Sequence, residues 1–113
     1  MARPRRTSAP RHLRGPTRKW FDEVTETYEL EQHHRKLLQL AGEAWDRAEQ
    51  AREALALHGL TYQDRFNQPH ARPEVAVERD ARLAFARLIR ELDLDADPPA
   101  SPSRPPRLAS NRG

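Results

Sequence analysis

The chain has 113 residues, which limits it to one domain, and it has no cysteine, which excludes disulfides and cysteine-ligated zinc. No apolar run approaches the roughly 18 residues of a membrane span, and no apolar stretch of a secretory signal follows the basic N-terminus. These features predict a soluble cytoplasmic protein with a small core, of the kind that oligomerisation often stabilises.

The net charge of +3 is distributed unevenly. Residues 1–19 hold seven basic and no acidic side chains, residues 20–95 hold ten basic and 16 acidic ones, and residues 96–113 hold three basic and one acidic. Basic arms bind polyanions through phosphate contacts and counterion release. The alternative is a solvated tail encoded by a GC-rich gene, because 18 of the 20 basic residues are arginine.

The N-terminal residues 1–16 are predicted to form a disordered basic arm, since three prolines and few apolar side chains cannot offset the entropy of an ordered chain. A short helix is expected from Thr17, with Trp20, Val24 and Tyr28 on one face. Basic side chains expected to contact DNA are Arg3, Arg5, Arg6, Arg11, Arg14, Arg18 and Lys19, together with Arg35 and Lys36 of a local "HHRK" patch whose alternative is a solvated helix face.

Residues 31–58 carry the strongest helical periodicity and are closed by Gly59. Gly42 is expected to be a weak point of this helix, costing roughly 1 kcal/mol relative to alanine. A last helix is predicted over residues 74–93, with Pro73 at its first position. Side chains expected in the core or between subunits are Trp20, Leu37, Ala41, Trp45, Ala48, Leu55, Phe85 and Leu88.

Between these helices lies "HGLTYQDRFNQPHARPEV", residues 58–75, which is expected to be a bend. Tyr62 and Phe66 are expected to pack the turn against the ends of the helices, while Asn67 takes a left-handed conformation. After the last helix, residues 96–113 have five prolines and are predicted to be a disordered tail.

The sequence has no pattern typical of a metal-binding or catalytic site. The histidines lack partners at ligand spacing, so no metal site is expected. All four serines fall in the predicted tails, where a catalytic triad could not be held in place, and no phosphate-binding loop is present. The sequence therefore predicts a protein that is not an enzyme and uses no cofactor.

The order of elements resembles the P27 family of phage terminase small subunits, over about Trp20 to Asp95. The resemblance rests on "LLQLAGEAWDRAEQAREALALHGLTYQDRF" followed by "RPEVAVERDARLAFARLIRELDLD", and Asn67 stands where many members have glycine. The end of the chain, Pro105 to Arg112, resembles the basic tail of the family. No single motif of the family is catalytic, so the resemblance depends on order and spacing.

The resemblance implies a non-catalytic, ring-forming homo-oligomer in the cytoplasm of the bacterial host, absent from the mature virion. Such a protein binds double-stranded viral DNA at the packaging-initiation site and recruits the large subunit, which holds the ATPase and nuclease. Two alternatives are a helical transcription regulator and an oligomeric adaptor that does not bind DNA. The expected fold is all-α: a long antiparallel helical hairpin with a short N-terminal helix in a domain spanning 17–95, flanked by the arm 1–16 and the tail 96–113.

Overall fold

The structure is a computed structural model that describes residues 9–94. Expectations for residues 1–8 and 95–113, including Arg3, Arg5, Arg6 and the proline-rich tail, lie outside the described residues. Three helices and a small strand pair follow in the order α1 (Gly15–Thr27), α2 (Gln32–His58), β1 (Thr61–Gln63), β2 (Pro69–Ala71) and α3 (Pro73–Leu92). The mostly helical fold class and the long helical hairpin are thereby confirmed.

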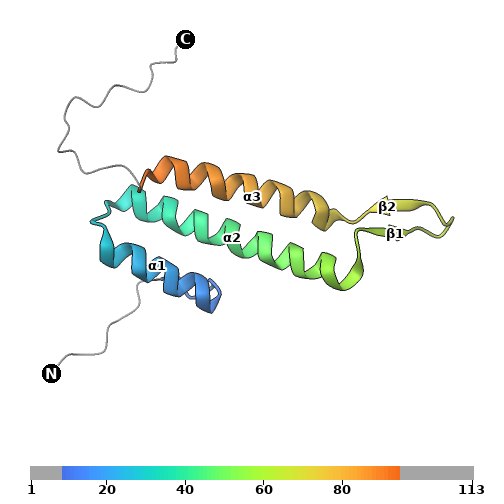
Figure 1. The fold of residues 1–113 in the computed structure, drawn as a ribbon, viewed down its shortest axis with the longest axis horizontal. Helices are drawn as coiled ribbons and strands as arrows, with labels where there is room; N and C mark the ends of the chain where they lie inside the picture. Colours follow the sequence, from blue (N-terminus) through green and yellow to red (C-terminus); the bar gives the residue numbers. More distant parts are fainter. Residues whose placement is uncertain (1–8, 95–113) are drawn as a thin grey trace, which may run out of the picture.

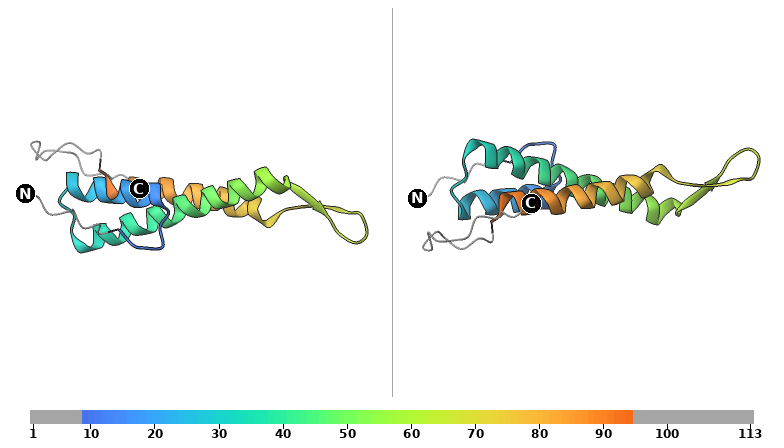
Figure 2. Two further views of the ribbon diagram at one scale, coloured as in Figure 1. Left: turned by 90° about the horizontal axis from the view of Figure 1, so that it is seen from below. Right: turned by 90° about the horizontal axis from the view of Figure 1, so that it is seen from above.

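Helices α2 and α3 run antiparallel along most of their lengths, and α1 lies beside the first half of α2 (Figure 1). Two further views show α1 and α3 in one layer and the first half of α2 in another (Figure 2). The three helices therefore form a triangle at one end of the molecule. At the other end only α2 and α3 remain, and the strand pair projects beyond them (Figure 1).

Local sequence explains where the helices begin and end. Pro16 and Pro73 stand in the first turns of α1 and α3, where a missing N–H costs nothing. Gly59 closes α2 with a φ of 88°, a conformation that glycine adopts without strain, and its N–H donates to the Leu55 carbonyl at 2.7 Å. The predicted helix stop at Gly59 and start at Pro73 are both confirmed.

The core sits in the three-helix end. Its buried members come from the N-terminal segment and from all three helices: Ala9, Leu13, Phe21, Val24, Leu38 and Leu92. Leu38 is fully buried, whereas Trp20, Leu37 and Ile89 pack around the cluster half-buried. Further along the pair, Ala41, Ala48 and Leu55 of α2 are buried, and small side chains there permit close contact with α3.

The segment between α2 and α3 differs from the expected bend because it forms a β-hairpin. Thr61 pairs with Ala71, Tyr62 with His70 and Gln63 with Pro69. Asn67 has a φ of 62°, which confirms the expected left-handed turn residue. The strands have only three residues each, too short for an alternating pattern to be recognised in the sequence.

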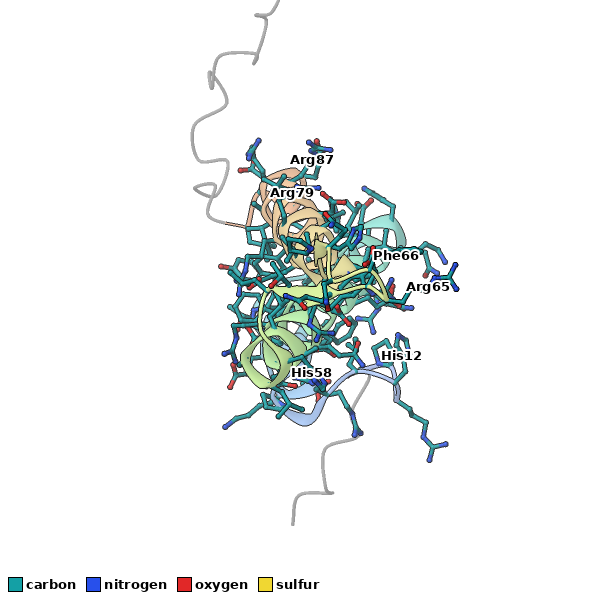
Figure 3. All side chains as sticks on the ribbon, turned by 90° about the vertical axis from the view of Figure 1, so that its right-hand side faces the viewer. His12, His58, Arg65, Phe66, Arg79 and Arg87 are labelled. Atoms are coloured by element: carbon teal, nitrogen blue, oxygen red, sulfur yellow. The ribbon has the colours of Figure 1, made fainter. Side chains whose placement is uncertain are left out.

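Packing of this segment against the helices was also expected, and for Phe66 that expectation is wrong. Phe66 is 67% exposed and contacts the Arg65 guanidinium, which lies 5.0 Å from the ring centroid. Tyr62 stacks on His70 with 5.3 Å between ring centroids, so it stabilises the hairpin itself. Both Arg65 and Phe66 point to one side of the projecting hairpin (Figure 3).

Candidate functional site

Residues 9–14 belong to the folded domain, so the expected arm boundary at residue 16 is wrong. Ala9 and Leu13 are buried, and Leu13 is only 4% exposed. Leu13 lies against α2 where Gly42 has no side chain: a Cβ there would come within 3.2 Å of Leu13 Cδ1 and of Thr17 Cγ2. Gly42 is thus the contact point for this segment, and its expected role as a mere weak point of the helix was incomplete.

Polar contacts attach the same segment to one acidic face of α2. Asp46 accepts hydrogen bonds from the backbone N–H of Arg14 at 2.8 Å and from the Thr17 hydroxyl at 2.5 Å. Arg14 is the N-cap residue of α1 and Thr17 lies in its first turn, so Asp46 attaches the start of that helix to α2 and its charge favours the positive end of the helix dipole.

Arg14 and His12 extend these contacts on both sides of Asp46. The Arg14 guanidinium binds Glu53 with both terminal nitrogens, at 3.0 and 2.8 Å, which lowers the pKa of that carboxyl. His12 Nε2 lies 2.8 Å from a Glu43 oxygen. The pKa of Glu43 is lowered first by the hydrogen bond from Gln39 and then by the one to His12.

The nine basic residues expected at DNA therefore fall into three groups. Arg3, Arg5 and Arg6 lie outside the described residues. Arg11, Lys19 and Lys36 are exposed. The other three are less available: Arg14 binds Glu53, Arg35 lies over the Phe21 ring at 5.7 Å, and Arg18 is half-buried, with its Nε out of reach of any acceptor among residues 9–94.

Arginines of α3 present a further basic surface that no prediction placed at DNA. Arg79 and Arg87 point outward from the side of α3 that faces away from α2 (Figure 3). Arg79 contacts Asp80 at 3.2 Å, and Arg82 binds Glu78 at 2.9 Å and approaches Glu49 of α2 at 4.0 Å. Within residues 9–94, neither Arg87 nor Arg90 forms an ion pair. The sequence shows these arginines along one helix, where they were expected to pair with surplus acidic side chains between helices or subunits.

An apolar groove runs between α2 and α3, with a volume of about 450 Å³. Leu40 is half-exposed, and Val77 is also exposed. Small and apolar side chains line the rest of the groove, and charged ones stand at its rim: Ala44, Ala81, Ala84 and Leu88, with Glu43, Arg47 and Asp80. Of the side chains expected in the core or between subunits, only Leu88 lines this groove.

A second hollow, of about 260 Å³, is lined by aromatic side chains from all three helices. Trp45 of α2 and Phe85 of α3 approach with 5.1 Å between ring centroids, and Trp20 of α1 lies 6.2 Å from Phe85. Pro16 and Thr17 complete the lining. Trp45, expected in the core or an interface, is 40% exposed at this hollow.

The tip of the β-hairpin is organised by Asp64, a residue that the sequence did not single out. Its carboxylate accepts hydrogen bonds from the N–H groups of Phe66 and Gln68 at 2.8 and 3.0 Å and lies 2.8 Å from His70 Nε2. The bond from Gln68 is the largest cause of a lowered pKa for Asp64, followed by the one with His70. Aspartate followed by a turn residue of the asparagine type was the available signal.

Neither a metal centre nor a membrane span is evident in the part of the chain that the structure describes. No group of three or more histidine, aspartate or glutamate side chains there could hold a metal ion. No helix there is both long and apolar enough to cross a membrane. The charged and apolar surfaces described above are therefore the candidate functional features.

Comparisons of the chain with protein-family models, with curated proteins and with solved structures found no match. The resemblance to terminase small subunits thus remains a prediction from the order and spacing of sequence elements.

Proposed function

We propose that this protein is the small subunit of a phage DNA-packaging terminase. In this proposal it has no catalytic role, assembles into a homo-oligomeric ring, binds double-stranded viral DNA at the packaging-initiation site, and recruits the large-subunit ATPase-nuclease. The family resemblance of the sequence supplies the terminase function, and the surfaces of the structure supply the physical support.

The groove between α2 and α3 carries the oligomeric part of this proposal. In a single copy, Leu40 and Val77 are exposed to water, which is unfavourable for apolar side chains. A neighbouring subunit that covers them would remove this cost in free energy. Alanines in the groove let another helix approach closely. Arg47 and Asp80 at the rim offer charges of both signs, so two copies can present opposite charges to each other.

DNA contact is assigned mainly to the N-terminal residues ahead of the folded domain. Residues 20–95 carry a net negative charge, which repels a duplex, whereas Arg3, Arg5 and Arg6 add positive charge without an acidic neighbour in sequence. Exposed Arg11 and Lys19 extend the same basic region. Phosphate contacts of this kind give affinity with little sequence discrimination.

Two measurements test the proposal. Light scattering should give a mass of several subunits for the intact chain, and Leu40→Glu with Val77→Glu should reduce it. Leu57→Glu is the matched control, because Leu57 is 78% exposed and does not line the groove. A monomer at all concentrations, or dissociation by the control alone, would contradict the oligomeric part.

Fluorescence anisotropy with labelled duplex DNA tests the second part. Deleting residues 1–8 should make the slope of log K against log salt concentration less negative by about 3, because three phosphate contacts are lost. A deletion to residue 16 is unsuitable because it removes the buried Ala9 and Leu13. The control is Arg65→Ala with Arg79→Ala and Arg87→Ala, which removes the same number of exposed charges elsewhere (Figure 3). Equal effects of the deletion and the control would refute the role of the arm.

A specific observation favours one alternative, an oligomeric adaptor without DNA contact. Two of the nine expected DNA-binding side chains, Arg14 and Arg35, are held by contacts within the chain, and a third, Arg18, is half-buried. An adaptor would show no duplex binding at moderate salt while still forming the oligomer and stimulating a partner ATPase. A transcription regulator would instead be a dimer that binds a palindromic site.

A further inference from the structure

The aromatic hollow of Trp20, Trp45 and Phe85 has the chemistry of a proline-binding site. Proline-rich segments dock in grooves lined by aromatic rings, where the proline ring lies flat on an aromatic face and little chain entropy is lost. Trp45 leaves 40% of its surface open to solvent here. Pocket lining comes from all three helices, so the folded domain holds the rings in place.

This hollow continues into a second groove that leads to the end of the described chain. Trp20 lines both, and the second groove, of about 550 Å³, runs between α1 and α3 past Val24, Ile89 and Arg90 to Leu94. Figure 2 shows α1 and α3 in the same layer, and no residue of α2 lines this groove.

The end of α3 places Leu94 at that groove. Asp93 has a left-handed conformation with a φ of 55°, and its N–H donates to the Ile89 carbonyl at 3.1 Å. A left-handed residue at this position ends the helix. Leu94 is accordingly half-buried, packs against the core cluster and lines the groove.

We propose that the Pro98–Pro99 pair of this chain's own C-terminal segment occupies the aromatic hollow. Leu94 lies nine positions after Phe85 and two beyond the end of α3, so the two are at most about 14 Å apart along the helix axis at 1.5 Å per residue. An extended proline-rich chain covers about 3.1 Å per residue, so the fourth and fifth residues after Leu94 reach about 12–16 Å. Those residues are Pro98 and Pro99.

The charges between Leu94 and the proline pair also favour this placement. Asp95 and Asp97 are the acidic residues between Leu94 and the proline pair. Arg90 and Asp93 both line the groove that they would follow, and no ion pair of Arg90 is formed within residues 9–94. An aspartate passing Arg90 would gain a favourable charge contact during docking. The second proline pair, Pro105 and Pro106, lies seven residues further along the chain and has no acidic residue just before it.

Tryptophan fluorescence tests this inference directly, because both tryptophans of the protein line the hollow and residues 95–113 contain no aromatic side chain. A chain ending at Leu94 should show emission at longer wavelength and stronger quenching by acrylamide than the full chain. Pro98→Ser with Pro99→Ser should reproduce that change, and Arg90→Glu should shift emission in the same direction. The matched control, Pro105→Ser with Pro106→Ser, should leave the emission as in the full chain. Circular dichroism should show the same helicity for all variants.

A synthetic peptide of residues 95–113 should restore the emission of the chain ending at Leu94. The peptide with both serines at 98 and 99 should bind about tenfold more weakly, a factor equivalent to about 1.4 kcal/mol. Unchanged emission on truncation, or an effect confined to the Pro105–Pro106 variant, would overturn the inference. Emission of the full chain that changes on dilution would assign the occupant to a second copy and would also overturn docking within one chain. None of these outcomes depends on DNA binding, so they stand apart from the proposed function.

Discussion

Leu13→Ala provides the sharpest test of whether the N-terminal segment is part of the fold. Leu13 is 4% exposed and packs where Gly42 allows close approach. Truncating a buried leucine costs 2–5 kcal/mol, and about 2–3 kcal/mol is expected here because a segment near the chain end can partly relax. A domain of this size has about 4–13 kcal/mol of stability in total. The substitution should therefore remove a large share of it.

Urea unfolding followed by circular dichroism, at one fixed protomer concentration, measures this difference. Leu57→Ala is the control, since Leu57 is 78% exposed and its truncation should change the unfolding free energy by less than about 0.5 kcal/mol. A similarly small change for Leu13→Ala would show that residues 9–14 do not stabilise the domain. The packing argument built on Gly42 would then fail.

Three other changes have defined outcomes. Gly59→Ala should destabilise the protein by about 1–2 kcal/mol in thermal or urea unfolding, because alanine is strained at a φ of 88°; no loss would mean that α2 ends differently. Asp64→Ala should speed amide exchange in the β-hairpin, whereas Asp64→Asn, which keeps an acceptor, should do so less; equal rates in the wild type and both variants would remove the proposed role of this carboxylate. Arg14 lowers the pKa of Glu53 in the folded state. The stability added by this ion pair is therefore present above pH 4.5, the ordinary pKa of the carboxyl, and is lost as the pH falls below that value. In urea unfolding at several pH values, the free energy of unfolding of Glu53→Gln should fall less steeply as pH is lowered than that of the wild type. The same steepness in both proteins would contradict the pairing.

Helical periodicity was a good guide where a helix face is long. Residues 31–58 repeat apolar side chains over many turns, and α2 occupies almost the same range. Glycine and proline marked the stops and starts correctly because each acts locally, through its own backbone. Gly59 and Pro73 needed no knowledge of the tertiary structure.

Tertiary contacts explain what the sequence did not reveal. Ala9 and Leu13 are isolated apolar residues among prolines and arginines, and Leu13 packs against a glycine about thirty residues away in α2. Asp46, equally distant, accepts the N–H of Arg14 and so attaches to α2 the start of a helix whose N-cap residue forms no side-chain cap. Neither partner can be found by inspecting the segment alone.

The candidate functional surfaces were also predictable only in part. Exposed basic residues such as Lys19 and Lys36 could be named from the sequence, but which arginines the fold engages could not. Arg14 and Arg35 are the same type of residue, yet Arg14 binds both oxygens of a carboxylate and Arg35 lies over an aromatic ring. Charge counts therefore overestimate the number of cations available to a polyanion.

The β-hairpin extends past the helices while leaving nearly all of its side chains in solvent. An element that buries so little is nearly independent of the folding equilibrium, since its opening exposes almost no apolar surface. Its tip is a position where a short peptide insertion or a chemical crosslinker should be tolerated by the rest of the chain. A label at Phe66 would accordingly report the distance between neighbouring copies in an assembly without disturbing the core that holds each copy together.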